Sequence, residues 1–199
     1  PPAAPGTDGH PFVYLREAGI PSLYLVSIAL ILMASALAVR AVSGPFRAMR
    51  SSLDLFFMGA AFLLLETKSV VQFALLFGTT WFVNALVFAG ILLSVLLAIE
   101  VAKRTKPNPR FLYGVLAVTI AIAFVVPESA LLQLAVVPRF LVAVAIAFGP
   151  VFCANLVFAE RFEMVERPTV AFGANLLGAM IGGTLEYASL VTGYRALLI

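Results

Sequence analysis

Cysteine and histidine are almost absent from this chain of 199 residues, which has Cys153 as its only cysteine and His10 as its only histidine. One cysteine excludes a disulfide framework. One histidine excludes a haem or chlorophyll held by histidines within a membrane and leaves little basis for a histidine-ligated metal. The sequence also lacks a glycine-rich phosphate or dinucleotide loop after a strand, a G-x-S-x-G motif and a zinc-binding pattern. We therefore expect no cofactor, no metal site and no catalytic residue in these residues.

Charged residues are scarce, at 12% of the chain, whereas hydrophobic residues make up 62%. A soluble domain of this length cannot bury so much apolar surface, so we expect an integral membrane protein. The net charge of +3 does not indicate nucleic acid, because the basic residues cluster in short loops between apolar runs. The expected partners are the lipid bilayer and either other membrane protein subunits or an adjoining soluble domain.

Long apolar runs recur along the chain and predict an all-α polytopic transmembrane helix bundle of six spans. Residues 1–20, which are rich in proline and glycine, are expected to form a juxtamembrane linker, and 21–199 a transmembrane helical domain. The start of a seventh span is a further possibility at 194–199. The expected spans are about 21–42, 53–76, 80–101, 111–126, 138–159 and 169–190.

The basic residues between the spans predict an orientation. If the first span runs inward, nine basic residues fall on the inner side and three on the outer side. The inner set is Arg40, Arg47, Arg50, Lys103, Arg104, Lys106, Arg110, Arg161 and Arg167, and the outer set is Arg16, Arg139 and Arg195. Because cytoplasmic loops carry the excess of lysine and arginine, we expect residue 1 on the non-cytoplasmic side of a bacterial cytoplasmic membrane.

Glu66 and Lys68 stand in the middle of the second expected span. A charged side chain at the bilayer centre costs at least about 2.5–3.5 kcal/mol, so both residues need polar partners inside the bundle. Lys68 shares a helix face with Gln72, whereas Glu66 points about 200° away from Lys68. One interpretation is a proton or substrate site, and the other is a buried polar contact that joins helices. The candidate partners on other spans are Asn84, Asn155, Asn175 and Glu186.

The sixth expected span carries small residues every fourth position, at Ala174, Gly178 and Gly182, and Glu186 continues this stripe. Small residues at this spacing let two helices approach closely in lipid. We interpret the stripe as a helix-packing surface.

Several stretches together resemble the membrane-spanning part of bacterial spermidine synthase-like (polyamine aminopropyltransferase-like) membrane proteins. They are TDGHPF at 7–12 leading to YLR at 14–16, GAAF at 59–62 leading to ETK at 66–68, LFG at 76–78 with Trp81, and GAN at 173–175 leading through GG at 182–183 to EY at 186–187. In that family a Rossmann-type S-adenosylmethionine-dependent domain is joined to transmembrane helices. The first stretch is similar to the family's T-D-D-x-P-F segment, in which Gly9 here replaces the second aspartate.

The resemblance implies a non-catalytic membrane-embedded domain that serves as an anchor or scaffold with a buried polar site. Any S-adenosylmethionine chemistry would belong to an adjoining domain, because the family's nucleotide-binding motifs have no counterpart in this sequence. Two other hypotheses stay open: an accessory structural subunit of a larger membrane complex, and a proton- or polyamine-linked transporter.

Overall fold

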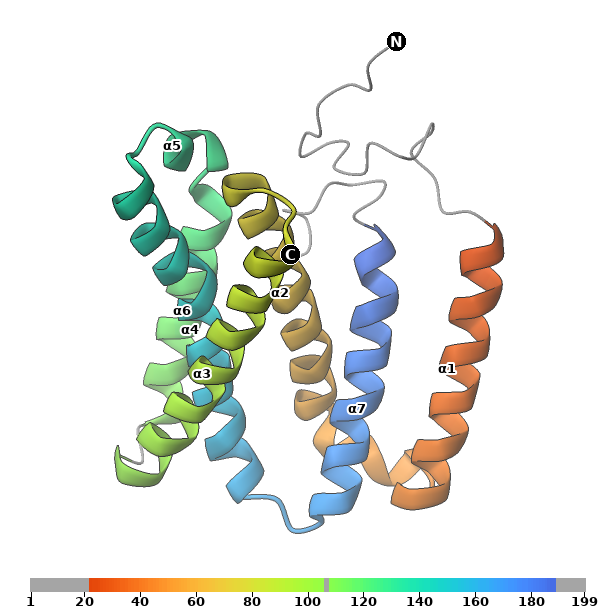
Figure 1. Cartoon of the computed structure of the whole chain (residues 1–199). Helices are drawn as coiled ribbons and strands as arrows, with labels where there is room; N and C mark the ends of the chain where they lie inside the picture. The colour runs from red at the N-terminus through yellow and green to blue at the C-terminus, as the bar shows by residue number, and fades with distance from the viewer. Residues whose placement is uncertain (1–21, 106–107, 189–199) are drawn as a thin grey trace. The chain divides into compact units, whose positions relative to one another are not determined.

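The structure is a computed structural model that describes residues 22–105 and 108–188. Regular structure within these residues is entirely helical, which confirms the predicted all-α class. The helices are α1 (Ser22–Ser43), η1 (Phe46–Ser52), α2 (Leu53–Phe77), α3 (Trp81–Thr105), α4 (Pro109–Val125), α5 (Glu128–Leu132), α6 (Val136–Glu163), α7 (Pro168–Leu185) and η2 (Glu186–Ala188) (Figure 1).

Five helical segments among the described residues are long and apolar enough to cross a membrane, which indicates a membrane-embedded protein. They are α1, η1 together with α2, α3, α6 and α7. The fourth expected span, 111–126, forms α4, whose 17 residues make it shorter than these five. Six spans are therefore not confirmed. The expected linker at 1–20 and the expected seventh span at 194–199 lie outside the described residues.

Local sequence signals set the helix ends. Gly44 follows α1 with φ of 85°, and Gly78 follows α2 with φ of 93°, a backbone conformation that only glycine adopts without strain. The Thr80 hydroxyl accepts a hydrogen bond of 3.2 Å from the Val83 backbone N–H at the start of α3. The Asn108 side chain accepts one of 3.0 Å from the Arg110 N–H, with Pro109 in the first turn of α4.

The chain divides into two compact units, each described by itself. Unit 1 comprises residues 1–64 and 166–199, and unit 2 comprises residues 65–165, so α2 contributes its first half to unit 1 and its second half to unit 2.

In unit 1, α7 packs against α1 and against η1 (Figure 1). The first half of α2 approaches α7 so closely that glycine is required at three positions. A Cβ atom at Gly59 would overlap the Asn175 carbonyl oxygen, and one at Gly178 would overlap the Phe56 carbonyl oxygen. At Gly182 it would lie 2.6 Å from the Ala60 carbonyl oxygen. The small residues of α7 thus form a packing surface whose partner is the backbone of α2.

In unit 2, α6 packs against both α3 and α4, and α5 also contacts α6. Phe73 from α2 stacks on Phe148 from α6, with ring centroids 5.6 Å apart, and meets Phe140 edge-on at 6.3 Å. Phe148 in turn lies over Gly90 of α3, because a Cβ atom there would overlap its ring. An aromatic cluster on α6 therefore fixes the second half of α2 and the middle of α3.

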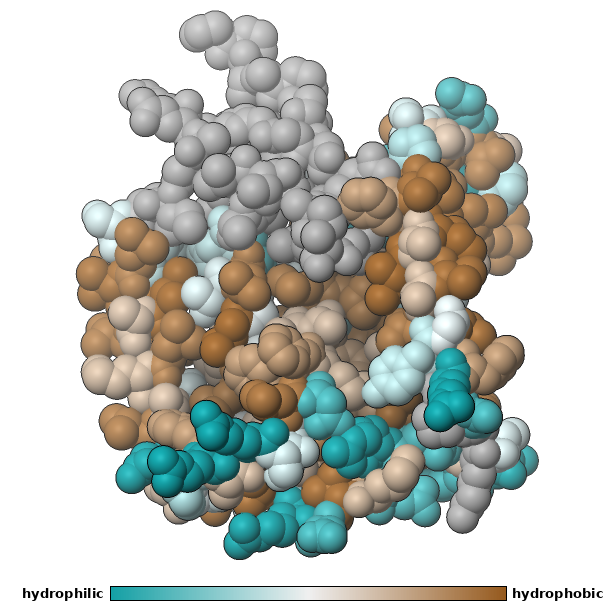
Figure 2. Space-filling model, turned by 180° about the vertical axis from the view of Figure 1, so that it is seen from behind, coloured by the Kyte–Doolittle hydropathy of each residue, from teal (hydrophilic) through white to brown (hydrophobic). Residues whose placement is uncertain are grey.

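Large apolar side chains cover the outer surface of the helices. Leu23 and Val42 of α1 are 75% and 76% exposed, and only Val39 and Ser43 of that helix are buried. Figure 2 shows hydrophobic side chains over most of the visible helix surfaces and hydrophilic side chains gathered toward helix ends. This distribution suits helices whose flanks face lipid.

The close approach of α2 and α7 leads to a stability prediction. We expect Gly178→Ala to lower the free energy of unfolding by about 1–3 kcal/mol, because the added methyl group meets backbone that must shift. Unfolding of the whole chain by a denaturing detergent in mixed micelles, followed by circular dichroism, measures this change.

Gly114→Ala in α4 is the matched control, since a Cβ atom there has nothing within 4 Å and the residue is exposed. This substitution should leave stability unchanged or raise it by about 0.5–1 kcal/mol, because alanine favours a helix interior. Equal effects of the two substitutions would contradict the packing argument.

Candidate functional site

The second half of α2 contains a fully buried polar pair. Lys68 is 2% exposed and Gln72 is 0% exposed, so both side chains are withdrawn from the surface. The Lys68 Nζ donates a hydrogen bond of 2.7 Å to the Gln72 Oε1. The pair follows from helix geometry, because residues four apart lie one above the other on the same face.

Buried residues flank this pair along α2. Phe73 and Leu76 follow it on α2 and are 1% and 4% exposed. The Ser69 hydroxyl is satisfied within the same helix, because it donates a 2.8 Å hydrogen bond to the Leu65 carbonyl oxygen. The Gln72 Nε2 is buried and has no hydrogen-bond partner among the described residues. An unsatisfied buried amide donor costs about 1–3 kcal/mol, so this atom marks a position at which a ligand or a water molecule would be stabilised.

Glu66 is separated from this pair by its position on the helix. Its side chain is half-buried, whereas that of Lys68, two residues later, is buried. Residues two apart on a helix do not face one another, so Glu66 and Lys68 lie on different sides of α2.

The other candidate polar residues fall at separate places. Asn84 lies in the first turn of α3 with an exposed side chain, so unit 2 does not bury it. Asn155 donates a 2.8 Å hydrogen bond to the Val151 carbonyl oxygen of its own helix, α6. In unit 1, Asn175 of α7 donates one of 3.0 Å to the Leu55 carbonyl oxygen, and Glu186 is the half-buried first residue of η2.

Asn175 therefore acts within the packing surface of α7. Its amide group reaches the backbone of α2 one turn from Gly59, and the neighbouring Ala174 is 1% exposed. A hydrogen bond to a backbone carbonyl already engaged in a helix adds a directional contact to an interface otherwise made of small residues.

Two features of unit 1 were not anticipated from the sequence. Gly59 on α2 faces the stripe on α7, and the run of small residues at 59–61 is the signal that indicates it. A cavity lies beside η1, lined in part by Phe46, Met49 and Arg50, and nothing in the residue pattern distinguishes it from an ordinary loop.

The chemical capacity of these residues is limited. Among the residues that the structure describes, no group of three or more histidine, cysteine, aspartate or glutamate residues is placed to hold a metal ion. The buried pair offers a hydrogen-bonded lysine and one amide donor. This set can hold a polar or anionic group, or can serve only to satisfy two buried polar side chains of α2.

No protein-family model matches the chain, and no curated protein or solved structure matches it.

The buried pair leads to a second prediction. Gln72→Leu should destabilise the chain by about 1–3 kcal/mol, because buried Lys68 loses one acceptor. Combining it with Lys68→Met should recover most of that loss, since two apolar side chains of similar size replace the pair. Detergent-induced unfolding of both single variants and the double variant gives the coupling energy between the two residues. Strictly additive losses would show that the hydrogen bond contributes nothing to stability.

Proposed function

We propose that these residues form the non-catalytic membrane-embedded domain of a spermidine synthase-like membrane protein, acting as an anchor and scaffold. The observation that supports this function is that polar side chains of the helices are bonded to other protein groups. Lys68 bonds Gln72 on its own helix, Asn175 bonds the α2 backbone, and Asn155 bonds the backbone of α6. Polar side chains that are bonded in this way stabilise a helical domain and are not available to act on a substrate.

The proposal includes α4 as a sixth span. Its 17 residues are about 26 Å long, which is near the lower limit for crossing the hydrocarbon core. If α4 crosses, Lys103 and Arg104 at the end of α3 lie on the same side of the membrane as Arg161 near the end of α6. If it does not cross, these basic residues are split between the two sides, which the asymmetry of lysine and arginine disfavours.

The same asymmetry orients the domain, with the start of α1 on the non-cytoplasmic side. A reporter enzyme that is active only outside the cytoplasm should therefore be active when fused before residue 1. It should be inactive when inserted in the loop at residues 106–107. The opposite pattern would show that the orientation is inverted.

Isolation of the native protein tests the anchor function. We expect antibodies against these residues to recover a polypeptide well above 21.2 kDa, because the proposed domain is joined to a soluble domain. Ultraviolet cross-linking with radiolabelled S-adenosylmethionine should then label peptides outside the present 199 residues. Label on α2 or α7 would contradict a non-catalytic role.

The same isolation separates the anchor from an accessory subunit. The surface of α1, where only Val39 and Ser43 are buried, offers an area for contact with a further protein as well as with lipid. Recovery of these residues as a separate polypeptide in a stable complex with other membrane subunits would favour the accessory role over the anchor.

Transport is a further candidate function. It is favoured by the buried Gln72 Nε2, which has no hydrogen-bond partner among the described residues and could donate to a transported group. Glu66, half-buried on the same helix, would be the charged residue of a proton or polyamine path.

Flux measurements decide between transport and anchoring. An anchor gives proteoliposomes no uptake of protons or spermidine above that of empty vesicles. A transporter gives uptake that Glu66→Gln abolishes and that Glu163→Gln, at an exposed residue at the end of α6, preserves.

A further inference from the structure

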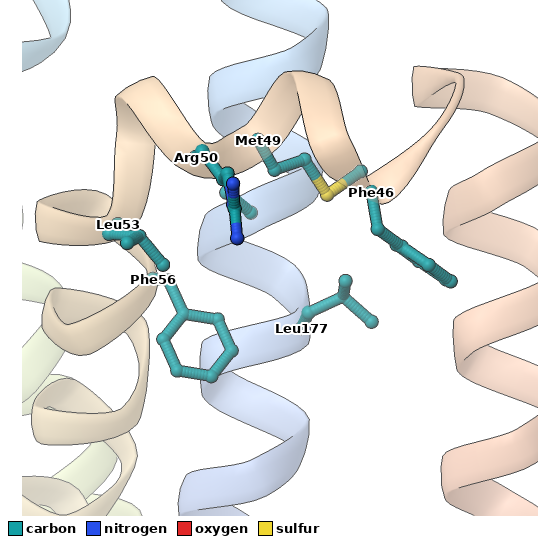
Figure 3. A pocket seen from close by; sticks show the side chains of 7 residues that line it. Phe46, Met49, Arg50, Leu53, Phe56 and Leu177 are labelled. Atoms are coloured by element: carbon teal, nitrogen blue, oxygen red, sulfur yellow. The ribbon is translucent and has the colours of Figure 1, made fainter.

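A cavity in unit 1 opens where η1 meets α2 and α7. Its volume is about 210 Å³. Residues of η1, α2 and α7 line it: Phe46, Met49 and Arg50 of η1, Leu53 and Phe56 of α2, and Ala174 and Leu177 of α7 (Figure 3). Engineered apolar cavities of roughly 150 Å³ stay dry and bind benzene, so this space accommodates a segment of hydrocarbon.

The lining combines an apolar interior with a single charge. Met49 is 6% exposed and belongs to a core cluster with Val39, Val170 and Ala174, against which Phe56 and Leu177 pack. The floor of the cavity is therefore fixed by packing. Arg50 is exposed and is the only charged residue among the described residues of the lining. Figure 3 shows it extending from η1 into the same space as Phe56 and Leu177.

Among the described residues, no carboxylate lines the cavity beside this arginine. Asp54, one turn further along, is not part of the lining. Arg40 adds positive charge at the same end of unit 1, where its guanidinium lies 5.9 Å from the centre of the Phe46 ring. The cavity therefore complements a molecule with an anionic head and an apolar tail.

We propose that this cavity binds an anionic phospholipid of the surrounding bilayer, with its phosphate on Arg50 and part of one acyl chain against Phe56 and Leu177. Guanidinium groups bind phosphate oxygens through paired hydrogen bonds. The positive-inside pattern of the sequence predicts that Arg40, Arg47 and Arg50 face the cytoplasm, whose leaflet carries anionic lipids.

A tryptophan reporter at the cavity tests this proposal. Phe46 is 43% exposed and lines the cavity, so Phe46→Trp places an indole ring there without crowding the core. Trp81, the only tryptophan of the chain, is removed by Trp81→Phe. The whole chain is reconstituted in phosphatidylcholine bilayers that contain increasing fractions of brominated phosphatidylglycerol, and quenching of the reporter gives the relative affinity of the two lipids.

The expected result is a preference for phosphatidylglycerol that Arg50→Gln lowers about fivefold. Arg47→Gln is the matched control, because it removes the same charge from an exposed position on η1 that does not line the cavity. It should lower the preference less than twofold. The unmodified chain, with Trp81 as reporter, should show no preference, since Trp81 does not line the cavity.

Three outcomes would overturn the proposal. Equal losses in Arg50→Gln and Arg47→Gln would show attraction to a diffuse surface charge. Equal quenching by brominated phosphatidylcholine would show ordinary contact with bulk lipid. Protection from both lipids would show that protein fills the cavity.

A second measurement tests the proposal if the Phe46→Trp variant does not fold. Native mass spectrometry of the otherwise unmodified chain should show bound phosphatidylglycerol that Arg50→Gln removes and Arg47→Gln retains. Absence of such adducts in the unmodified chain would also overturn the proposal.

Discussion

Hydrocarbon offers no hydrogen-bond partner to a polar side chain, and the described structure is arranged around this constraint. Along α2, a helix otherwise made largely of apolar residues, Lys68 and Gln72 are hidden from the surface and bonded to each other. The i, i+4 spacing supplies this contact without the help of a second helix, because a single helix provides both residues. One residue further along α2, Phe73 packs against the aromatic rings of Phe140 and Phe148 of α6.

Unit 1 meets the same constraint in another way. Lipid gives helices no hydrophobic reason to associate, so close van der Waals contact and hydrogen bonds must hold them together. Gly178 and Gly182 let α7 rest on the backbone of α2, and Asn175 adds a hydrogen bond to the Leu55 carbonyl oxygen within the same surface. A side chain larger than hydrogen at either glycine would separate the two helices and lengthen that bond. The stripe of small residues and the asparagine therefore act together.

Some of these features can be predicted from the sequence and others cannot. Apolar runs of about 20 residues identify long helices, because a bilayer crossing requires that length. The pairing of Lys68 with Gln72 also follows from sequence, because it depends only on helical spacing. The status of α4 does not, since 17 residues lie at the boundary between a short span and a buried helix. The cavity beside η1 was equally inaccessible, because it depends on how α7 packs against η1 and the start of α2, more than 100 residues earlier in the sequence.

Buried polar residues in the middle of a helix and exposed charged residues near a helix end have different roles in this chain. Lys68 and Gln72 are withdrawn from the surface and satisfy each other in part, so their replacement acts first on stability. Arg50 is exposed beside an apolar cavity, so its removal leaves the packed floor around Met49 intact and acts on what the cavity holds. A scaffold needs the first kind to keep its helices together and the second to fix its depth in the bilayer. The proposed anchoring and the proposed lipid binding thus rest on one distribution of charge, in which mid-helix polarity is internal and exposed charge lies toward helix ends.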